Sequence, residues 1–93
     1  MESNVIPLDI IIPVYNESET VIEVIESLYS NVQIDFDLYF IYDHDSDTTL
    51  PFINKYKKKS SNSTIYSIKN LFDKGALNAI KTGFITAKND YIL

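Results

Sequence analysis

Cysteine and arginine are both absent from this 93-residue chain, and histidine occurs once, as His44. Without cysteine there is neither a disulfide framework nor a thiolate zinc site. A single imidazole also excludes metal sites built on several histidines, so a divalent cation would have to bind carboxylate oxygens, which suit Mg²⁺ or Mn²⁺ better than Zn²⁺. Without arginine, a phosphate group could be held only by backbone amides, lysine or a metal ion.

Glycine and proline are also scarce, with two and three copies, whereas 45% of the residues are hydrophobic. This composition predicts a globular chain and argues against disorder and low complexity. The net charge is −5, and the only basic cluster, at 55–59, is accounted for by the end of a helix. We therefore expect no nucleic-acid partner.

Long apolar runs are missing too. No segment approaches the ~20 residues that span a bilayer. Residues 1–7 have no basic flank leading into an apolar stretch, as a signal peptide would have. We expect one cytoplasmic domain over residues 1–93, while a membrane anchor elsewhere in a longer parent protein stays open.

Short apolar runs predict strands at 8–14, 36–42 and 63–68, and residues 90–93 look like the start of a fourth. The first run shows little alternation of apolar and polar residues, which is typical of a strand covered on both faces. Pro13 lacks an N–H group and should end its ladder. The incomplete fourth strand would leave an apolar edge through which two copies of the chain could pair.

Two of the expected helices have recognisable starts. Asn16 can cap the first helix, and Glu19 follows three residues later, as in a capping box. Asp47 or Thr49 can cap the second helix, with Pro51 in its first turn, where a missing N–H costs little.

A third helix is expected at 75–88, with small residues on its buried side that would let it lie close to a sheet. That side is expected to carry Ala76, Ala79, Ile80, Gly83, Phe84 and Ala87. The resulting order β-α-β-α-β-α-β predicts an α/β fold with a Rossmann-like parallel sheet.

Ligands bind to such a sheet beyond the carboxyl ends of its strands. This rule selects three loops, at 13–17, 43–49 and 70–78. In the first loop, Tyr15 offers a ring on which a base could stack, and Asn16 and Glu17 could accept hydrogen bonds from a ribose. A capped helix beside a partly buried tyrosine explains the same residues.

The second loop holds three alternating carboxylates, Asp43, Asp45 and Asp47. Carboxylates this close repel one another unless they cap backbone amides, bind a cation or accept hydrogen bonds from a ligand. Helix capping and Asx-turns explain them as well as a ligand site does. An EF-hand is disfavoured because Thr48 stands in place of the required glycine and no glutamate closes the loop.

In the third loop, Lys74 could reach a phosphate group, and Gly75 would allow a ligand to approach closely. Neither a Walker nor a Rossmann glycine pattern is present, which argues against an ordinary ATPase or dehydrogenase. A receiver-type signalling domain is also disfavoured, since the first turn carries Pro-Val-Tyr-Asn-Glu where paired acids would be needed.

Three segments resemble, in order and spacing, the N-terminal part of family 2 glycosyltransferases: 10–17 (IIIPVYNE), 42–49 (YDHDSDTT) and 74–83 (KGALNAIKTG), the last preceded by Asn70. The resemblance covers nearly the whole chain. It implies the N-terminal half of a GT-A fold, an inverting reaction and a UDP- or GDP-linked sugar as donor. Within the family, the chain resembles the polyprenyl-phosphate sugar transferases most.

The resemblance also implies roles for individual residues. Pro13 and Tyr15 would line the base pocket, and Asp43 would accept a hydrogen bond from the base. Glu17 would lie near the ribose and diphosphate, with Lys74 beside the nucleotide. Together with the contacts expected from the loops, the nucleotide-sugar-binding set is Pro13, Tyr15, Asn16, Glu17, Asp43, Asp45, Lys74 and Gly75.

Two segments depart from the family pattern. His44 and Asp45 replace the usual Asp-Gly, and 71–73 replaces a shorter turn that contains glycine. The family's Asp-x-Asp-type motif for Mg²⁺ or Mn²⁺, and its catalytic base, would both follow residue 93. The resemblance therefore assigns no catalytic residue and no metal ligand here, and it implies that the chain alone is inactive. The alternative is a non-catalytic nucleotide-binding module.

Overall fold

The computed structural model describes residues 8–32, 35–60, 64–87 and 91–92. Strands and helices alternate in the predicted order. The elements are β1 (Leu8–Pro13), α1 (Thr20–Asn31), β2 (Phe36–Tyr42), α2 (Thr49–Ser60), β3 (Ile65–Lys69), α3 (Ala76–Thr86) and β4 (Tyr91–Ile92). Four residues assigned above to expected elements, Ser63, Lys88, Asp90 and Leu93, lie outside the described residues.

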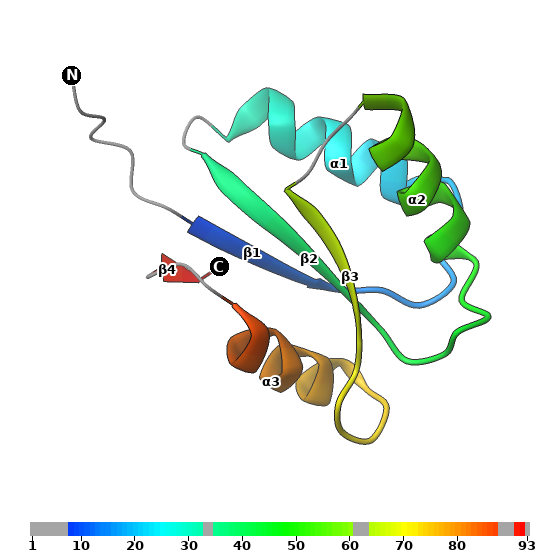
Figure 1. Ribbon diagram of the computed structural model, residues 1–93, viewed down its shortest axis with the longest axis vertical. Helices are drawn as coiled ribbons and strands as arrows, with labels where there is room; N and C mark the ends of the chain where they lie inside the picture. The colour runs from blue at the N-terminus through cyan, green and yellow to red at the C-terminus, as the bar shows by residue number, and fades with distance from the viewer. Residues whose placement is uncertain (1–7, 33–34, 61–63, 88–90, 93) are drawn as a thin grey trace.

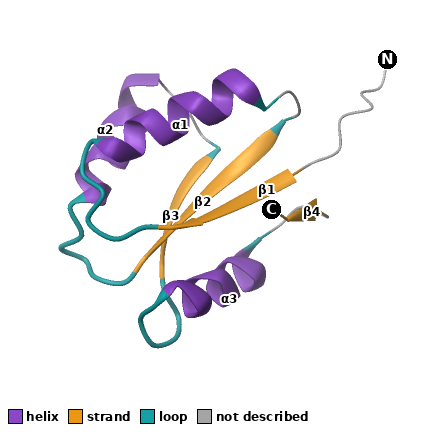
Figure 2. Ribbon diagram, turned by 180° about the vertical axis from the view of Figure 1, so that it is seen from behind, coloured by secondary structure: helices purple, strands orange, loops and turns teal. Residues whose placement is uncertain are grey.

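The strands form one parallel sheet in the order β3-β2-β1-β4. Helices α1 and α2 cover one face, and α3 lies alone on the other (Figures 1 and 2). This arrangement is the α/β fold that the order of elements predicted. The carboxyl ends of β1, β2 and β3 point to the same end of the sheet, so the loops that follow these strands gather there (Figure 1).

The central strand β2 is buried on both faces. Leu38 and Phe40, both fully buried, face α1 and α2 together with Ile25 and Ile53 from those helices. Tyr39 and Ile41 face α3 instead, where they pack with Ala79. Burial on both faces is the pattern expected for a strand inside a parallel sheet. The loop that follows β2 therefore begins at a tightly packed strand.

Strand β1 ends at Pro13, as predicted. The next residue still donates its N–H to the Ile41 carbonyl oxygen of β2, at 3.0 Å. Because successive N–H groups of a strand point to opposite neighbours, the missing N–H of Pro13 faces away from β2. Pro13 therefore leaves the β1–β2 pairing intact, and the described β1–β4 pairs, at Leu8 and Asp9, lie before it.

The start of α1 differs from the prediction. The helix begins at Thr20, and no side chain caps it, so the expected capping box of Asn16 and Glu19 is wrong. The first N–H groups of the helix are satisfied by backbone carbonyls instead: Thr20 donates to Glu17 at 3.1 Å, and Ile22 donates to Glu19 at 3.0 Å. A backbone turn of this kind makes a side-chain cap unnecessary.

Helix α3 lies close to the sheet through small residues, as predicted. Ala79, Thr82 and Gly83 are buried, and a Cβ atom added to Gly83 would overlap with the side chain of Ile11 on β1. The expected burial of Ala76, Ile80 and Phe84 is wrong: Ala76 is exposed, and Ile80 and Phe84 are 38% and 58% exposed. At this short distance only small side chains fit between helix and sheet. The large apolar side chains of α3 therefore lie on its outer side, where Leu77 and Ile85 are also exposed, and Leu71 and Phe72 are exposed in the preceding loop.

None of the described helices is both long and apolar enough to cross a bilayer.

The contact of Gly83 with Ile11 generates a stability prediction. Alanine favours a helix over glycine by about 1 kcal/mol, yet we expect Gly83→Ala to lower the free energy of unfolding by about 1–3 kcal/mol because its methyl group would meet Ile11. Urea unfolding measures the change. In the Ile11→Ala background the penalty should shrink, and a Gly83→Ala chain more stable than wild type would contradict the close approach.

Candidate functional site

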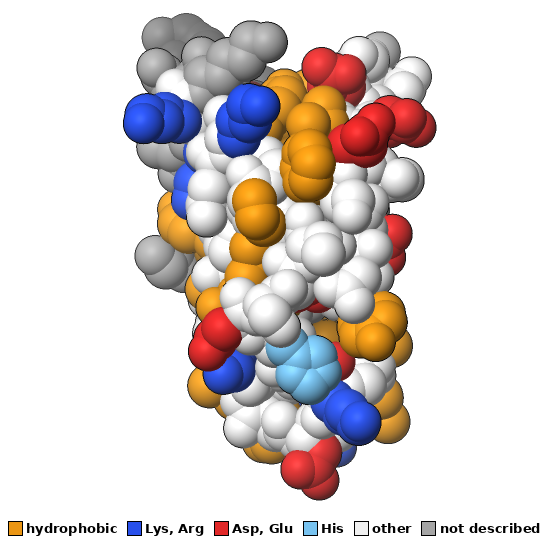
Figure 3. Space-filling model, turned by 90° about the vertical axis from the view of Figure 1, so that its right-hand side faces the viewer, with side chains coloured by type: hydrophobic (Ala, Val, Ile, Leu, Met, Phe, Trp, Pro, Cys, Tyr) orange, Lys and Arg blue, Asp and Glu red, His pale blue; other side chains and the backbone are white. Residues whose placement is uncertain are grey.

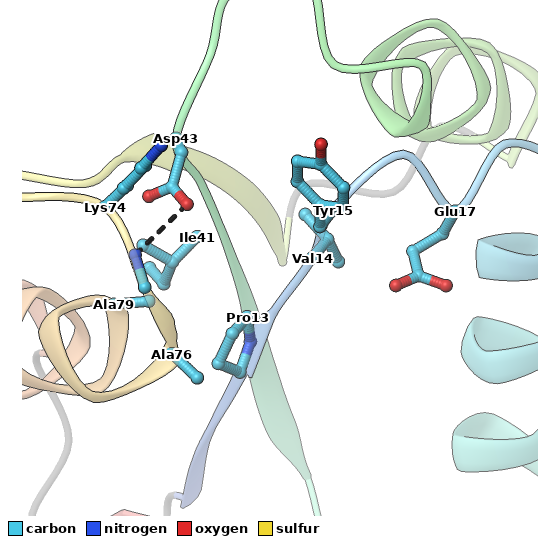
Figure 4. A pocket seen from close by; sticks show the side chains of 10 residues that line it. Pro13, Val14, Tyr15, Glu17, Ile41, Asp43, Lys74, Ala76 and Ala79 are labelled. Atoms are coloured by element: carbon cyan, nitrogen blue, oxygen red, sulfur yellow. Dashed lines mark hydrogen bonds between the residues drawn. The ribbon is translucent and has the colours of Figure 1, made fainter.

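A groove of about 540 Å³ lies at the carboxyl ends of β1 and β2. This volume is typical of small-molecule sites, which run from about 300 to 1,000 Å³. The groove is lined by Pro13, Val14, Tyr15, Glu17, Ile41, Asp43, Lys74, Gly75, Ala76 and Ala79. One wall therefore comes from the loop after β1, the floor from the end of β2, and the other wall from the start of α3 (Figure 4).

Tyr15 and Asp43 face each other across the groove. The Tyr15 ring stands on the wall formed by the loop after β1, whereas Asp43 and Lys74 belong to the opposite side of the groove (Figure 4). Tyr15 is 63% exposed, so its flat face is available to a ligand. Among the residues that the structure describes, Lys74 is the only cationic one in the groove lining. The groove thus combines an aromatic surface, a carboxylate and one positive charge.

Asp43 accepts two hydrogen bonds, one from Asn70 directly after β3 and one from Gly75 directly before α3. Asn70 Nδ2 donates to Asp43 Oδ1 at 3.0 Å, and the Gly75 N–H donates to Asp43 Oδ2 at 3.3 Å, as the dashed line in Figure 4 marks. Each carboxylate oxygen can accept more than one hydrogen bond, so Asp43 retains acceptor capacity toward the groove. The carboxylate is therefore fixed in its orientation and can still accept a hydrogen bond from a ligand.

Gly75 has a backbone φ of 122°, a conformation that side-chain-bearing residues rarely adopt. No atom lies within 4 Å of the position its Cβ would occupy, so the requirement for glycine is conformational and does not come from crowding. This turn brings the Gly75 N–H to Asp43 and starts α3 at the groove. The N-terminal N–H groups of the 11-residue α3 therefore begin beside Lys74.

Glu17 lies on the groove's border but points elsewhere. Figure 4 shows its carboxylate on the far side of Val14 and Tyr15, toward α1. On that side Glu17 lines a smaller hollow of about 170 Å³, together with Val21 and Val24 of α1. Its carboxylate and that of Asp43 are therefore separated by the backbone of the first loop.

The loops after β1 and β2 are joined by a set of hydrogen bonds that we call the loop clasp, made of Asn16, Glu17, Asp47, Thr48 and Thr49. Asp47 Oδ1 accepts from the N–H groups of Thr49, at 2.7 Å, and Asn16, at 3.0 Å. In return, Asn16 Oδ1 accepts from the Thr48 N–H at 3.0 Å, and the Glu17 N–H donates to Thr49 Oγ1 at 2.8 Å. Asp47 thus bonds the start of α2, as predicted, and also fixes the first loop.

The carboxyl of Asp47 is only 3% exposed. Burial alone would raise its pKa, but the hydrogen bonds from Thr49 and Asn16, with the nearby His44, outweigh burial and hold the pKa below its ordinary value of 3.8. Asp47 is therefore ionised at neutral pH. Asn16 adopts a φ of 47°, in the left-handed region, as part of this contact. Its amide oxygen is used in the clasp, and Asn16 does not line the groove.

Asp45 also lies outside the groove. Its carboxylate pairs with Lys69 at 3.2 Å, and both side chains are more than half exposed, so the pair contributes little to stability. Figure 3 looks onto the side of the molecule that carries α2 and the 43–49 loop, where lysines, carboxylates and apolar side chains are interspersed. No charge of one sign dominates this face.

The three alternating aspartates therefore have three different partners. Asp43 faces the groove, Asp45 pairs with a lysine, and Asp47 closes the loop clasp. Within the described ranges, no group of three or more histidine, aspartate or glutamate side chains could hold a metal ion. Of the expected nucleotide-sugar-binding set, the groove brings together Pro13, Tyr15, Glu17, Asp43, Lys74 and Gly75, with Glu17 at its border.

Sequence reasoning missed the side-chain roles of Asn70 and Thr82. Asn70 directly follows β3, as Asp43 directly follows β2, and the adjacent carboxyl ends of these strands bring the two side chains together. Its position directly after a strand could have predicted the contact with Asp43. The sequence did not indicate a role for Thr82, since a threonine in the middle of a helix is more often a surface or packing residue.

Residues 9–93 match glycosyl transferase family 2. The chain is also similar to a poly(ribitol-phosphate) beta-glucosyltransferase of Bacillus spizizenii (strain ATCC 23059 / NRRL B-14472 / W23), with 32% identity over 89 residues. That alignment covers 92% of this chain and 14% of the relative, so the chain spans only a small part of the relative's length.

The ionised Asp47 generates a pH prediction. Asp47→Asn keeps an acceptor oxygen but loses the charge, so we expect it to lower the free energy of unfolding at pH 7 by about 1–2 kcal/mol. Because the pKa of Asp47 is lowered on folding, this contribution is complete above the unfolded value of 3.8 and is lost as the pH falls through the folded value.

Urea unfolding between pH 7 and pH 2 measures this difference, with the exposed Asp45→Asn as the matched control. The gap between wild type and Asp47→Asn should close toward acid pH, while Asp45→Asn stays close to wild type at every pH. A gap that is constant down to pH 2 would contradict an ionised Asp47 in the clasp.

Proposed function

The chain belongs to glycosyl transferase family 2, and we propose that its groove binds the nucleotide part of a nucleotide-diphosphate-sugar donor for an inverting sugar transfer. The observation that carries the proposal is the pair of facing groups, an exposed Tyr15 ring opposite a carboxylate fixed by two hydrogen bonds. An aromatic face and a fixed acceptor are what a purine or pyrimidine base needs for stacking and for in-plane recognition.

The carboxylate suits some bases better than others. Asp43, when ionised, only accepts hydrogen bonds, so it fits a base edge that presents a ring N–H. Uracil and guanine present such an N–H, whereas adenine presents a ring nitrogen that is itself an acceptor. UDP or GDP is therefore the proposed nucleotide, with Tyr15 stacking on the base and Pro13 completing the pocket.

The other wall of the groove suits the diphosphate. Lys74 supplies the one positive charge in the lining, and the first N–H groups of α3 add a partial positive charge there. Gly75 leaves the space beside this helix end open. With no arginine in the chain, these groups are the available phosphate ligands of the groove.

Three members of the expected set are less well supported by their positions. Glu17 would contact the ribose only if its carboxylate turned from the α1 side toward the groove. Asn16 and Asp45 are engaged by Thr48 and Lys69, so we propose supporting roles for them and no direct contact with the donor.

The Mg²⁺ or Mn²⁺ expected for the full-length enzyme does not fit the groove by itself. Asp43 and Glu17 are its only carboxylates, and they lie on opposite sides of the first loop. We therefore propose that the metal ligands and the catalytic base belong to other parts of a longer enzyme, and no step of the transfer is assigned to a residue here.

The acceptor is proposed only as a class. The similar Bacillus protein is named for a poly(ribitol-phosphate) acceptor, and the sequence motifs led us to expect a polyprenyl-phosphate sugar transferase. Both names denote acceptors that carry phosphate. We propose an acceptor of that chemistry and a cytoplasmic site of action, where nucleotide sugars would be available.

A nucleotide titration tests the binding proposal. Amide shifts of the labelled 93-residue chain are followed while UDP, GDP or ADP is added, with and without Mg²⁺ or Mn²⁺. We expect UDP or GDP, but not ADP, to shift the amides around Tyr15, Asp43 and Lys74. Lys74→Ala should weaken binding by about tenfold, the loss expected for one charge-assisted contact.

Lys81→Ala is the matched control, because Lys81 is exposed on α3 and does not line the groove. It removes the same charge and should leave the dissociation constant unchanged. Equal losses in both variants would mean that general electrostatic attraction, and not Lys74, holds the nucleotide. No shift with any nucleotide in a folded chain would refute the proposal for this chain.

Turnover separates the proposal from its alternative. We expect the purified 93-residue chain to release no nucleoside diphosphate from UDP- or GDP-sugars above the rate without protein. Detectable transfer would show that the chain holds a complete catalytic set. If a longer parent enzyme with an intact groove also lacks transfer activity, the non-catalytic nucleotide-binding module becomes the better description.

Self-association through the sheet edge at β4 is also proposed. β4 is the last strand in the sheet order of the described residues. Sedimentation at increasing concentration would detect it, and a strictly monomeric profile would count against it.

A further inference from the structure

Asn70 lies at the end of β3, outside the groove lining. Its hydrogen bonds connect β3 with the end of β2 and with α3. Its own N–H donates to the Tyr42 carbonyl oxygen at 2.8 Å, which extends the β2–β3 pairing by one residue. Its side chain reaches Asp43 after β2 on one side and Thr82 of α3 on the other. The side chain therefore connects the groove carboxylate to the buried face of α3.

The orientation of the Asn70 amide is determined by its neighbours. Asn70 Oδ1 lies 3.1 Å from the Phe72 N–H, which can only donate, so the oxygen must be on that side. Thr82 Oγ1 donates to the same oxygen at 2.8 Å and accepts from the Leu71 N–H at 2.9 Å. The amide nitrogen then donates to Asp43 Oδ1, its nearest acceptor, at 3.0 Å, while the carbonyl oxygens of Asp73 and Gly75 lie farther away, at 3.4 and 3.5 Å.

Thr82 is fully buried, and its hydroxyl is used both as donor and as acceptor. Such a hydroxyl has one rotamer that satisfies both partners. It therefore fixes the orientation of the Asn70 amide, and that amide in turn fixes the orientation of the Asp43 carboxylate. Asp43, Asn70 and Thr82 thus form a chain of hydrogen bonds, here called the relay, that starts inside α3 and ends at the groove.

We infer that Asn70 is a positioning residue for donor binding: through the relay it holds the Asp43 carboxylate in the orientation in which it meets the base. The inference rests on the proposed function. Asn70 does not line the groove, and its shortest side-chain link to a residue that does is the 3.0 Å hydrogen bond to Asp43, so its effect on binding passes through Asp43. A carboxylate fixed before binding loses less conformational freedom when the base arrives.

The sharpest variant is Asn70→Asp. It has the same shape and keeps an oxygen for the Phe72 N–H and the Thr82 hydroxyl, but it replaces the amide donor with a carboxylate facing Asp43. We expect this change to weaken UDP or GDP binding by about tenfold, the loss typical of one hydrogen bond to a charged group. Asn54→Asp, on the exposed side of α2, adds the same charge and should bind as wild type does.

A cycle with Asp43→Asn distinguishes positioning from general damage. The swapped chain, Asn70→Asp with Asp43→Asn, again pairs an amide with a carboxylate, so its unfolding midpoint should recover relative to Asn70→Asp alone. Its nucleotide binding should stay as weak as that of Asp43→Asn and become no weaker, because Asn70 acts only through Asp43. Isothermal titration and urea unfolding give both quantities on the same samples.

Each result is decisive. Wild-type affinity in Asn70→Asp, or losses that multiply in the swapped chain, would overturn the positioning role while leaving the proposed function in place. A wild-type chain that binds neither UDP nor GDP would overturn the proposed function and the positioning role together. Thr82→Ser, which keeps the hydroxyl, should bind within about twofold of wild type, whereas Thr82→Val should weaken binding several-fold. Equal binding by these two variants would remove Thr82 from the relay.

Discussion

The arrangement of the groove depends on the hydrogen bonds that the buried carboxylate of Asp47 accepts. The loops after β1 and β2 carry Tyr15 and Asp43, and the sheet joins the two loops where they begin, through the hydrogen bond from the Val14 N–H to Ile41. Farther from the sheet, Asp47 holds the loops together by accepting hydrogen bonds from the N–H groups of Asn16 and Thr49. An ionised acceptor strengthens both hydrogen bonds, and burial shields them from water and salt.

The other wall is set by a steric constraint. Gly83 lets α3 lie against Ile11 of β1, and this approach places the start of the helix beside the end of β2. Gly75 then needs a φ of 122° to turn the chain from the β3 loop into the helix. The position of Lys74 is therefore a consequence of packing further along α3, so a substitution far from the groove can move its only cation.

The fold could be predicted from the sequence because it depends on local patterns: apolar runs of strand length, helical spacing, and their alternation. The errors arose where tertiary contacts decide. Asn16 has the right spacing for a cap, but its side chain bonds Thr48 across the groove end of the sheet. In α3 the apolar residues surround the helix, so periodicity could not tell that small side chains would face the sheet and Phe84 the outside.

The acidic loop shows how one short motif can serve several purposes. Three alternating carboxylates would repel one another, and the fold relieves that repulsion by giving each a different partner: amide donors for Asp43, Lys69 for Asp45, and backbone N–H groups for Asp47. Of the three aspartates, Asp43 is the one that borders the groove lined by Tyr15 and Lys74. Because the partners are distributed in this way, the loop does not gather its charges around a cation. It presents a single acceptor, and a single fixed acceptor beside an aromatic ring is suited to recognise a base.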